Sequence, residues 1–591
     1  MCGIYGWLSK PLQQFPADPL ATMGQALSHR GPDDNGEYID KAKYIALGHN
    51  RLSIIDLTSA GHQPMVSADG RSVLVYNGEL YNFMALRREL EQAGQIFYSR
   101  TDTEVVLKSL CQWGEQALHR FCGMFALAFW SADDNSLLLA RDPLGMKPLY
   151  YTPLPGGAGM AFASEIKAFL VLPGFRARID PHALRQFLEF GYTFWGDGTS
   201  LAGVRKVLPG QFLRLRQGRI VSCEAYYSPP ALGCGTDSLS DRVAAVHSCL
   251  DQVVAEHLVA DVPVGLLLSG GLDSSLVAAL AARRTKVATI SMGFAESNID
   301  ERPYARSVSR HIGSDHQEIL ITPDEIAGSI EEAIWTFDDL FADWGTISTR
   351  LMYKKCREQG LKVVLVGEGS DELFGGYPSF VAATTLRGPS LWKIFQLYRR
   401  YAGRRYGGLF SEFRRIMASH LSAGEGDLFH AVRLFEACNQ LPNNYVMKVD
   451  KASMAVSVEA RAPFLDRRVA DIAFATPREF LLRDGVNKFL LREAARRYQL
   501  LPAEIIDRPK FGGSMAASWI DEVPSFREYA RQVVLDPGGW VDELGLRPAM
   551  NSYFAGRRRG YRFPHAISIF SNLAWRLFQL NLWSKKYLNV G

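Results

Sequence analysis

A short loop near the middle of the chain carries residues suited to binding a phosphate group. It reads Ser269-Gly-Gly-Leu-Asp-Ser-Ser275 and directly follows the apolar stretch 262–268. Two glycines permit close backbone approach, and hydroxyls follow where a helix begins, so backbone N–H groups and the helix N-terminus can cradle an anion. The GxxxxGK[ST] pattern of a Walker A loop is absent. The loop predicts a phosphate site of another kind, with an incidental strand–turn–helix as the alternative.

A second acidic and glycine-rich segment follows another apolar stretch. It reads Val366-Gly-Glu-Gly-Ser-Asp-Glu372. Ligands of a doubly wound sheet bind at the carboxyl ends of its strands, so Asp273 and Asp371 can face one site. Carboxylates there would hold Mg²⁺ bound to phosphates. Lys488, at the start of an expected helix, could neutralise phosphate charge. A solvated acidic turn and an ordinary surface lysine are the alternatives.

Cys2 is the residue best suited to nucleophilic catalysis. After removal of Met1, one residue would carry both a thiol and an α-amine, and the amine, with a pKa of about 8, could act as base for its own thiol. A buried structural cysteine is the alternative. The position of Cys2 and the Gly3-Ile-Tyr-Gly6 sequence that follows argue against that alternative.

The elements that must position these residues change in character along the chain. Residues 1 to about 220 contain short β-type runs and a few helical patterns, which predicts an α+β layered unit. The loop 228–237 is rich in Pro and Gly and indicates a linker. Beyond it a helix over 242–258 and strands over 262–268, 287–294 and 361–366 predict a parallel α/β sheet, and residues 380–591 are mainly helical. We therefore expect domains at 1–227 and 238–591.

Composition excludes several classes of protein. The 591 residues are 47% hydrophobic and 22% charged, as in globular proteins, and the net charge of +4 is too small to indicate nucleic-acid binding. The eight cysteines form no CxxC pair, which argues against a zinc site or a disulfide framework and favours a cytoplasmic setting. No stretch of about 18 apolar residues occurs, so no membrane span is expected.

The ordered motifs resemble a known family. The N-terminal start resembles class II glutamine amidotransferases of the N-terminal-nucleophile type. Five further segments carry the same resemblance: 29–33, 51–56, 76–82, 101–104 and 141–151. The loop 269–275 resembles the pyrophosphate loop of ATP-pyrophosphatases. In this order the motifs resemble the glutamine-hydrolysing asparagine synthetases. The implied fold is an α+β N-terminal-nucleophile hydrolase sandwich followed by an α/β ATP-pyrophosphatase domain with a helical C-terminal part.

The resemblance implies a glutaminase site in the first domain. Cys2 would attack the glutamine amide and release ammonia, with the Asn77 side chain and the Gly78 N–H as the oxyanion hole. Arg51 would bind the α-carboxylate. Glu79 and Asp102 would hold the α-ammonium. Surface charge is the alternative for these charged residues. The expected glutamine-binding set is Arg51, Leu52, Ser53, Ile54, Ile55, Asn77, Gly78, Glu79 and Asp102.

The resemblance also implies an ATP site in the second domain, with Mg²⁺ at Asp273 and Asp371. Glu368 would support acyl-adenylate chemistry or attack by ammonia, which must travel through the interior, and Lys488 would steady the phosphates. Segment 461–466 matches the family but receives no chemical role. The expected ATP-binding set is Leu268, Ser269, Gly270, Gly271, Asp273, Ser274, Ser275, Met292, Val366 and Gly367.

The acceptor carboxylate is the open point. Phe341, Ala342 and Trp344 stand where classical asparagine synthetases, which the chain resembles, carry a Thr-Thr-Ile-Arg type segment. Aspartate is the default acceptor. A sugar uronic acid is an alternative acceptor, and the basic stretch 392–415 could contribute to binding it, although a solvated helical surface is the simpler interpretation of that stretch.

Two other classes of protein are alternatives. A cyclising relative of the β-lactam synthetase type would lack Cys2, and a degenerate scaffold would lose Cys2, Asp273 or Glu368. Partners are expected to be small molecules, with a homodimer possible.

Overall fold

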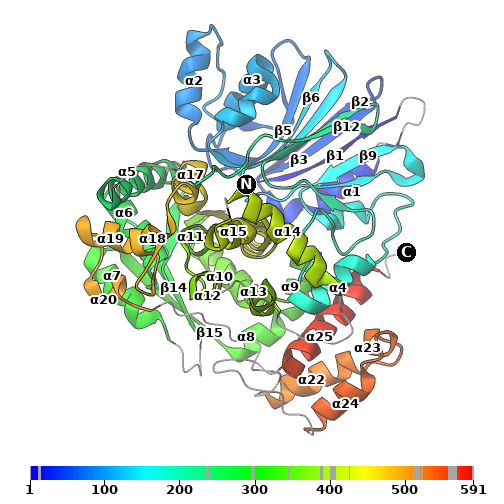
Figure 1. Cartoon of the computed structure of the whole chain (residues 1–591). Helices are drawn as coiled ribbons and strands as arrows, with labels where there is room; N and C mark the ends of the chain where they lie inside the picture. Colours follow the sequence, from blue (N-terminus) through cyan, green and yellow to red (C-terminus); the bar gives the residue numbers. More distant parts are fainter. Residues whose placement is uncertain are drawn as a thin grey trace.

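A computed structural model defines the architecture. It describes residues 2–10, 15–16, 18–232, 238–294, 300–343, 345–385, 391–399, 408–424, 426–509, 520, 523–556 and 569–588. Two halves lie side by side: antiparallel sheets from the first 225 residues form one, and a parallel sheet with many helices forms the other (Figure 1).

Two six-stranded antiparallel sheets form the N-terminal half. The first has the order β10 (Arg205–Lys206), β8 (Tyr150–Pro153), β9 (Gly159–Ala163), β1 (Gly3–Ser9), β3 (Ile45–Arg51) and β2 (Asp34–Asp40). The second has the order β12 (Arg219–Ala225), β11 (Gln211–Arg216), β7 (Ser136–Arg141), β6 (Gly123–Ser131), β5 (Ser72–Leu80) and β4 (Met65–Val66).

A dry apolar layer joins the two sheets. Inward-facing side chains from both sheets form it, because alternate residues of a strand point to one face; they include Ile4, Leu47, Val75, Ala128 and Leu139. The outer layers hold α1 (Pro19–Ala26), which contacts β1 and β3, and α2 (Phe83–Gln92) and α3 (Asp102–Trp113), of which α3 contacts β5. The layered α+β fold predicted for this half is confirmed.

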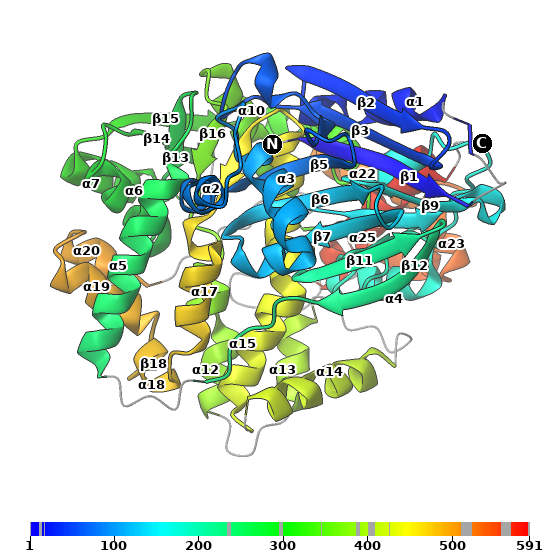
Figure 2. The same ribbon diagram turned by 90° about the horizontal axis from the view of Figure 1, so that it is seen from above.

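A five-stranded sheet organises the C-terminal half, and its pairings are all parallel. Its order is β15 (Asp315–Ile321), β14 (Ala288–Phe294), β13 (Val264–Leu267), β16 (Val363–Leu365) and β17 (Glu459–Arg461). Helices α6 (Leu272–Ala282) and α7 (Arg302–Ile312) pack against β13 and β14, while α10 (Thr346–Glu358) contacts β15 and α16 (Val446–Met454) contacts β17 (Figure 2).

The structure corrects several sequence predictions. Strands β15 and β17 were not predicted, because β15 is a half-polar edge strand and β17 has only three residues inside a region that is otherwise helical. Helix α5 (Leu239–His257) begins earlier than expected, after a capping box formed by Ser238 and Asp241. Helix α6 begins at Leu272 rather than near Ser274, which places Asp273 in its first turn.

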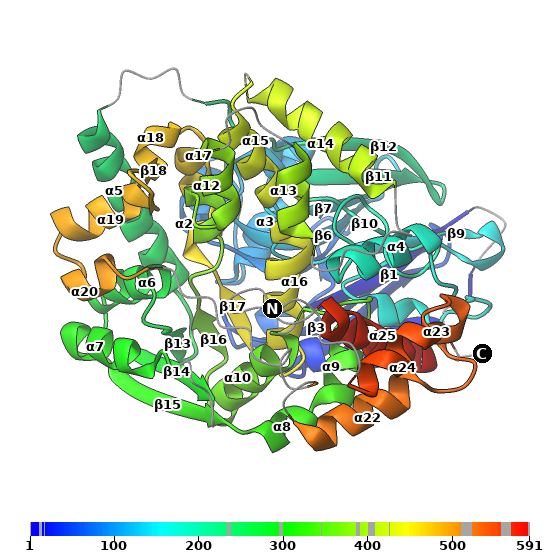
Figure 3. The same ribbon diagram turned by 60° about the horizontal axis from the view of Figure 1, so that its bottom comes forward.

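Further helices fill the space around the parallel sheet. The helices α22 (Pro524–Val534), α23 (Trp540–Glu543), α24 (Arg547–Phe554) and α25 (Ile569–Tyr587) form a separate group beneath the N-terminal sheets (Figure 3). The remaining helices are α4 (Pro181–Phe190), α8 (Pro323–Gly328), α9 (Ile330–Thr336), α11 (Ser370–Phe374), α12 (Pro378–Thr385), α13 (Leu391–Tyr398), α14 (Leu409–Ala423), α15 (Leu428–Phe435), α17 (Arg467–Phe474), α18 (Arg478–Leu481), α19 (Phe489–Arg497) and α20 (Ala503–Ile506). Of these, α4 and α9 contact α25, whereas α19 and α20 lie at the opposite side of the molecule (Figure 3). Across the described segments, no helix combines the length and apolar character that crossing a membrane requires.

Candidate functional site

A narrow pocket in the N-terminal half gathers most residues of the expected glutamine site. The strand ends of β1, β3 and β5 and the first turn of α3 meet there. Of the expected set, Ser53 and Asn77 do not line the pocket: the Ser53 backbone N–H donates to Asp33 (2.9 Å). The lining residues are Cys2, Arg51, Leu52, Ile54, Ile55, Gln63, Tyr76, Gly78, Glu79, Thr101, Asp102 and Thr103.

Cys2, which lines this pocket, is held against Asn77. The Cys2 backbone nitrogen donates to Asn77 Oδ1 at 2.8 Å. The other end of the Asn77 amide, Nδ2, is buried and has no hydrogen-bond partner within the part of the chain that the structure describes. A buried amide donor without a partner is costly unless a ligand accepts its hydrogen bond. Burial also raises the pKa of the Cys2 thiol, so forming a thiolate there requires a nearby base.

Arg51 is fixed in the wall of the pocket. Its Nη1 donates to the Thr58 carbonyl (2.9 Å) and its Nη2 to the Asp56 carbonyl (2.5 Å). A Cβ on Gly61 would lie 1.9 Å from Nη2, so only glycine leaves room for the guanidinium. A cation held by backbone carbonyls on one side can present its remaining N–H groups to an anion on the other.

Two carboxylates, Glu79 and Asp102, line the pocket. Asp102, in the first turn of α3, accepts from the Leu80 backbone N–H (2.9 Å). Burial raises the pKa of Asp102 to about 6. Glu79 forms an ion pair with Arg461, whose Nη2 lies 3.0 Å from Glu79 Oε2. An acidic pair in a closed pocket can hold a substrate cation.

A larger cavity of about 580 Å³ opens at the carboxyl ends of the parallel strands. The loop after β13, the start of α11 and the start of α19 contribute to it, which matches the crevice expected in a doubly wound sheet. The lining residues are Ser269, Gly271, Leu272, Asp273, Glu301, Asp371, Gly376, Gly485, Val486, Asn487, Lys488, Arg492, Arg496, Asp507, Arg508 and Pro509.

Lys488 connects the two expected metal-binding carboxylates. Its Nζ lies 2.5 Å from Asp273 Oδ2 and 2.6 Å from Asp371 Oδ1. Burial acts to lower the pKa of Lys488, but the two carboxylates outweigh it and the pKa lies above its ordinary value. Lys488 adopts a left-handed backbone conformation (φ 54°), which is uncommon outside glycine and favours a functional role. Gly376 leaves the space that Asp371 and Lys488 occupy.

The loop 269–275 is organised by its own hydroxyls. Ser269 Oγ lies 3.0 Å from Ser274 Oγ and accepts from the Gly271 backbone N–H at 3.2 Å. Gly270 has φ 70°, and a Cβ there would lie 2.5 Å from the Ala305 backbone nitrogen. The second glycine-rich segment touches this loop, since a Cβ on Gly367 would meet the Ser274 backbone nitrogen at 2.7 Å. The two motifs therefore form one surface.

Several expected residues of the second half lie near the cavity without lining it. This group comprises Leu268, Gly270, Ser274, Ser275, Met292, Val366, Gly367 and Glu368. Glu368 is partly exposed, and burial raises its pKa, with Lys448 acting in the opposite direction. Ser275 is fully buried in the first turn of α6.

Sequence reasoning missed the arginines of the cavity. Arg508 donates to the Gly270 carbonyl (3.1 Å) and pairs with Glu301 (2.9 Å). Arg492 donates from Nε to the Asn487 carbonyl (2.9 Å), directly before Lys488. No spacing in the sequence singled out either arginine. The neighbouring residues 510–513 lie outside the described residues.

The segment that the sequence associated with the acceptor packs between the two halves. The Ala342 backbone N–H donates to the Gly191 carbonyl (2.7 Å), and Trp575 Nε1 donates to the Ala342 carbonyl (3.1 Å). The Phe341 ring packs against Tyr192. Phe341 and Ala342 are therefore buried residues that join the two halves. Trp344 lies outside the described residues. Residues 400–407 of the basic stretch 392–415 also lie outside them.

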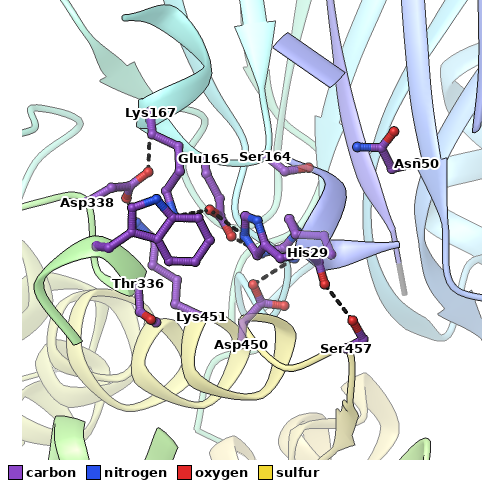
Figure 4. Close-up of polar contacts among 12 residues, drawn as sticks. His29, Asn50, Ser164, Glu165, Lys167, Thr336, Asp338, Asp450, Lys451 and Ser457 are labelled. Atoms are coloured by element: carbon purple, nitrogen blue, oxygen red, sulfur yellow. Dashed lines mark hydrogen bonds and ion pairs between the residues drawn. The ribbon is translucent and has the colours of Figure 1, made fainter. Parts of the chain in front are cut away.

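A buried ionic cluster joins the two halves, where Glu165 and Lys167 lie beside Asp338, Asp450 and Lys451 (Figure 4). Arg30 donates to the Cys2 carbonyl (3.0 Å), Glu165 (2.7 Å) and Asp450 of α16 (2.9 Å). Lys147 also contacts Asp450, at 3.3 Å. The pKa of Arg30 lies above its ordinary value: burial acts to lower it, but Asp450 and Glu165 outweigh burial. Cys2 is thus connected through one side chain to the C-terminal half.

The fold and the family models define a class: a glutamine amidotransferase half joined to a ligase half whose parallel sheet carries the glycine-rich loop 269–275. The Asparagine synthase family model matches residues 245–585, and the Glutamine amidotransferase domain model matches residues 1–227. The chain belongs to the asparagine synthase family and is an enzyme of its glutamine-hydrolysing ligase type.

Similar proteins extend over most of the chain. Asparagine synthetase [glutamine-hydrolyzing] 1 of Bacillus subtilis is 32% identical over 561 residues, which cover 87% of this chain and 86% of that protein. A putative asparagine synthetase [glutamine-hydrolyzing] of Mycobacterium tuberculosis is 31% identical, covering 87% of each chain. Asparagine synthetase B of Escherichia coli is 30% identical, covering 91% of this chain and 86% of the other.

Proposed function

We propose that the first half, residues 1–227, hydrolyses glutamine. The Cys2 thiol attacks the side-chain amide, and the Asn77 Nδ2 and Gly78 N–H groups stabilise the resulting oxyanion. Arg51 binds the α-carboxylate, and Glu79 and Asp102 hold the α-ammonium. The support is the buried Asn77 amide, which already contacts Cys2 and retains an unused donor within the described part of the chain.

The second half, residues 238–591, activates a carboxylate with ATP. The acceptor oxygen attacks the α-phosphorus, pyrophosphate leaves, and ammonia then displaces AMP from the acyl-adenylate to give the amide. The loop 269–275 binds the pyrophosphate, Lys488 balances its charge, and Glu368 removes a proton from the attacking ammonia. The observation that carries this proposal is the convergence of Asp273, Asp371 and Lys488 beside the phosphate loop.

The donor set suits Mg²⁺. In the described residues, no group of three or more His, Cys, Asp or Glu side chains forms a cage for a metal. Two carboxylates on neighbouring motifs are what Mg²⁺ uses when substrate phosphates supply further ligands. Asp273 and Asp371 would hold the ion, and bound Mg²⁺ would neutralise charge on the phosphates. Lys488 would then turn from the carboxylates toward the phosphates.

We take L-aspartate as the acceptor, because the similar proteins named above are asparagine synthetases. The test is pyrophosphate release with glutamine, ATP and Mg²⁺, with and without L-aspartate, followed by mass analysis of the product. Aspartate-dependent pyrophosphate with asparagine supports the full proposal. Glutamate release without aspartate-dependent pyrophosphate would overturn the choice of acceptor and direct the search to other carboxylates, beginning with nucleotide-linked uronic acids.

Two variants separate the sites. Cys2→Ala is expected to abolish glutamine-driven synthesis and to retain synthesis driven by ammonium. Asp273→Ala is expected to abolish both syntheses and to retain glutamate release. Glutamine-driven synthesis by the Cys2→Ala variant would contradict the role of Cys2. Loss of glutamate release by Asp273→Ala would contradict the separation of the two sites.

A further inference from the structure

The segment Arg461-Ala-Pro-Phe-Leu-Asp466 has no role in the function proposed above, yet its arginine reaches the glutamine pocket. Arg461 ends β17 at the edge of the parallel sheet and is fully buried. Its Nη2 donates to Glu79 Oε2 at 3.0 Å, across a separation of 382 residues in the chain. The C-terminal half thus supplies a cation to a pocket whose lining comes from the N-terminal half.

The arginine side chain is anchored by the C-terminal half. Its Nε donates to Glu459 Oε1 (2.5 Å), and its Nη1 donates to the carbonyls of His257 (2.7 Å) and Val259 (2.8 Å). Its backbone is also fixed, because the Val366 N–H donates to the Arg461 carbonyl (2.9 Å). Every nitrogen of the planar guanidinium has a defined partner, so its direction toward Glu79 is set.

Arg461 favours the charged form of Glu79. Burial raises the pKa of Glu79 well above its ordinary value, and Asp102 and Glu459 act in the same direction, while Arg461 opposes them. Tyr81, which lies beside these groups, is neutral because burial raises its pKa. A protonated Glu79 would lose most of its attraction for an ammonium group.

We propose that Arg461 is a positioning residue of the glutamine site: it holds Glu79 as an oriented carboxylate for the α-ammonium of the substrate. This inference rests on the proposed role of Glu79. Arg461 lies behind Glu79 rather than at the amide that reacts, so its loss weakens glutamine binding and leaves the hydrolytic step largely intact.

The test measures glutamate release by the full chain against glutamine concentration, without ATP or acceptor. Arg461→Met removes the charge and is expected to raise KM by about tenfold to a hundredfold, the effect of losing one charged hydrogen bond, with kcat changed by less than about threefold. Arg461→Lys retains the charge without the planar fork and recovers part of the KM. Arg433→Lys is the matched control, because Arg433 is equally buried but donates to the Ala473 and Phe474 carbonyls.

A buried carboxylate without its partner can prevent folding. The double variant Arg461→Met/Glu79→Gln removes both charges, and its KM is expected to equal that of Glu79→Gln alone, as for residues that act as one unit. A higher KM than that of Glu79→Gln would overturn the inference. An unchanged KM in Arg461→Met would also overturn it, as would a fall in kcat of that variant as large as its rise in KM. A rise in KM of the same size in Arg433→Lys would overturn it too.

The outcomes for this inference and for the proposed function are distinguishable. Absence of glutamate release from the unaltered protein would overturn the glutaminase role and the role of Arg461 together. Glutamate release by the unaltered protein with no KM change in Arg461→Met would overturn the role of Arg461 alone.

Discussion

Adding one methyl group at Gly376 is expected to damage the nucleotide site selectively. The new Cβ would lie 1.8 Å from Asp371 Oδ1 and 2.5 Å from the Cε atom of Lys488. Carbon contacts are normally about 3.5 Å, so the carboxylate must move by more than about 1 Å. That movement separates Asp371 from the Lys488 ammonium, which now lies 2.6 Å away. The Gly376→Ala change therefore tests whether this pair supports ATP binding.

The size of the effect follows from the contact that is lost. A hydrogen bond between charged groups contributes about 1.5–3 kcal/mol. Each 1.4 kcal/mol corresponds to about tenfold in affinity, so the Kd for MgATP is expected to rise about tenfold to a hundredfold. Titration calorimetry measures this Kd without any need to know the acceptor. Glutamate release, assayed on the same preparation, is expected to keep its KM.

Gly328→Ala is the matched control, because a Cβ there meets no atom within 4 Å. It makes the same chemical change in α8 and is expected to leave both measurements unchanged. A Kd for MgATP within twofold of the original value in Gly376→Ala would refute the role given to the Asp371–Lys488 pair. A parallel loss of glutamate release would refute the selectivity.

Two further predictions concern protonation and stability. Burial raises the pKa of Asp102 to about 6, so this carboxyl becomes neutral as the pH falls through about 6. In glutamate-release assays, the KM for glutamine is therefore expected to rise below that pH, and the Asp102→Asn variant is expected to lose this pH dependence. An Asp102→Asn variant whose KM still rises below pH 6 would contradict this assignment. Asp450→Asn leaves Arg30 short of a buried carboxylate and is expected to destabilise the fold by about 3–5 kcal/mol. Thermal unfolding checks this against Asp133→Asn, whose partner Arg71 is exposed and whose effect should be near zero.

The local sequence pattern was sufficient to predict the elements that carry the proposed phosphate site. Apolar runs followed by Gly-rich, hydroxyl-rich or acidic residues correctly placed the loops after β13 and β16, because a buried parallel strand is apolar throughout and ends where polarity returns. The position of Lys488 at the start of a helix was also correct. Strand β17 was not found, since three residues give too little periodicity to separate a strand from its helical surroundings.

Departures from a family pattern were harder to interpret from the sequence. Phe341 and Ala342 suggested a changed acceptor site, but both side chains are packed in the core between the two halves. A change from polar to apolar residues has the same appearance in sequence whether the side chain faces a substrate or a neighbouring helix. Only the direction of the side chain separates the two cases.

The sequence alone determined the class of fold, the order of the two units and the motifs proposed as nucleophile, oxyanion donor and phosphate loop, because each motif depends on neighbours close in the chain. The tertiary structure decided which distant charges meet. Glu79 and Arg461, Arg30 and Asp450, and Lys488 and Asp273 are separated by hundreds of residues, so no spacing relates them. Buried charges must find partners, and the packing of the two halves determines which partners they find.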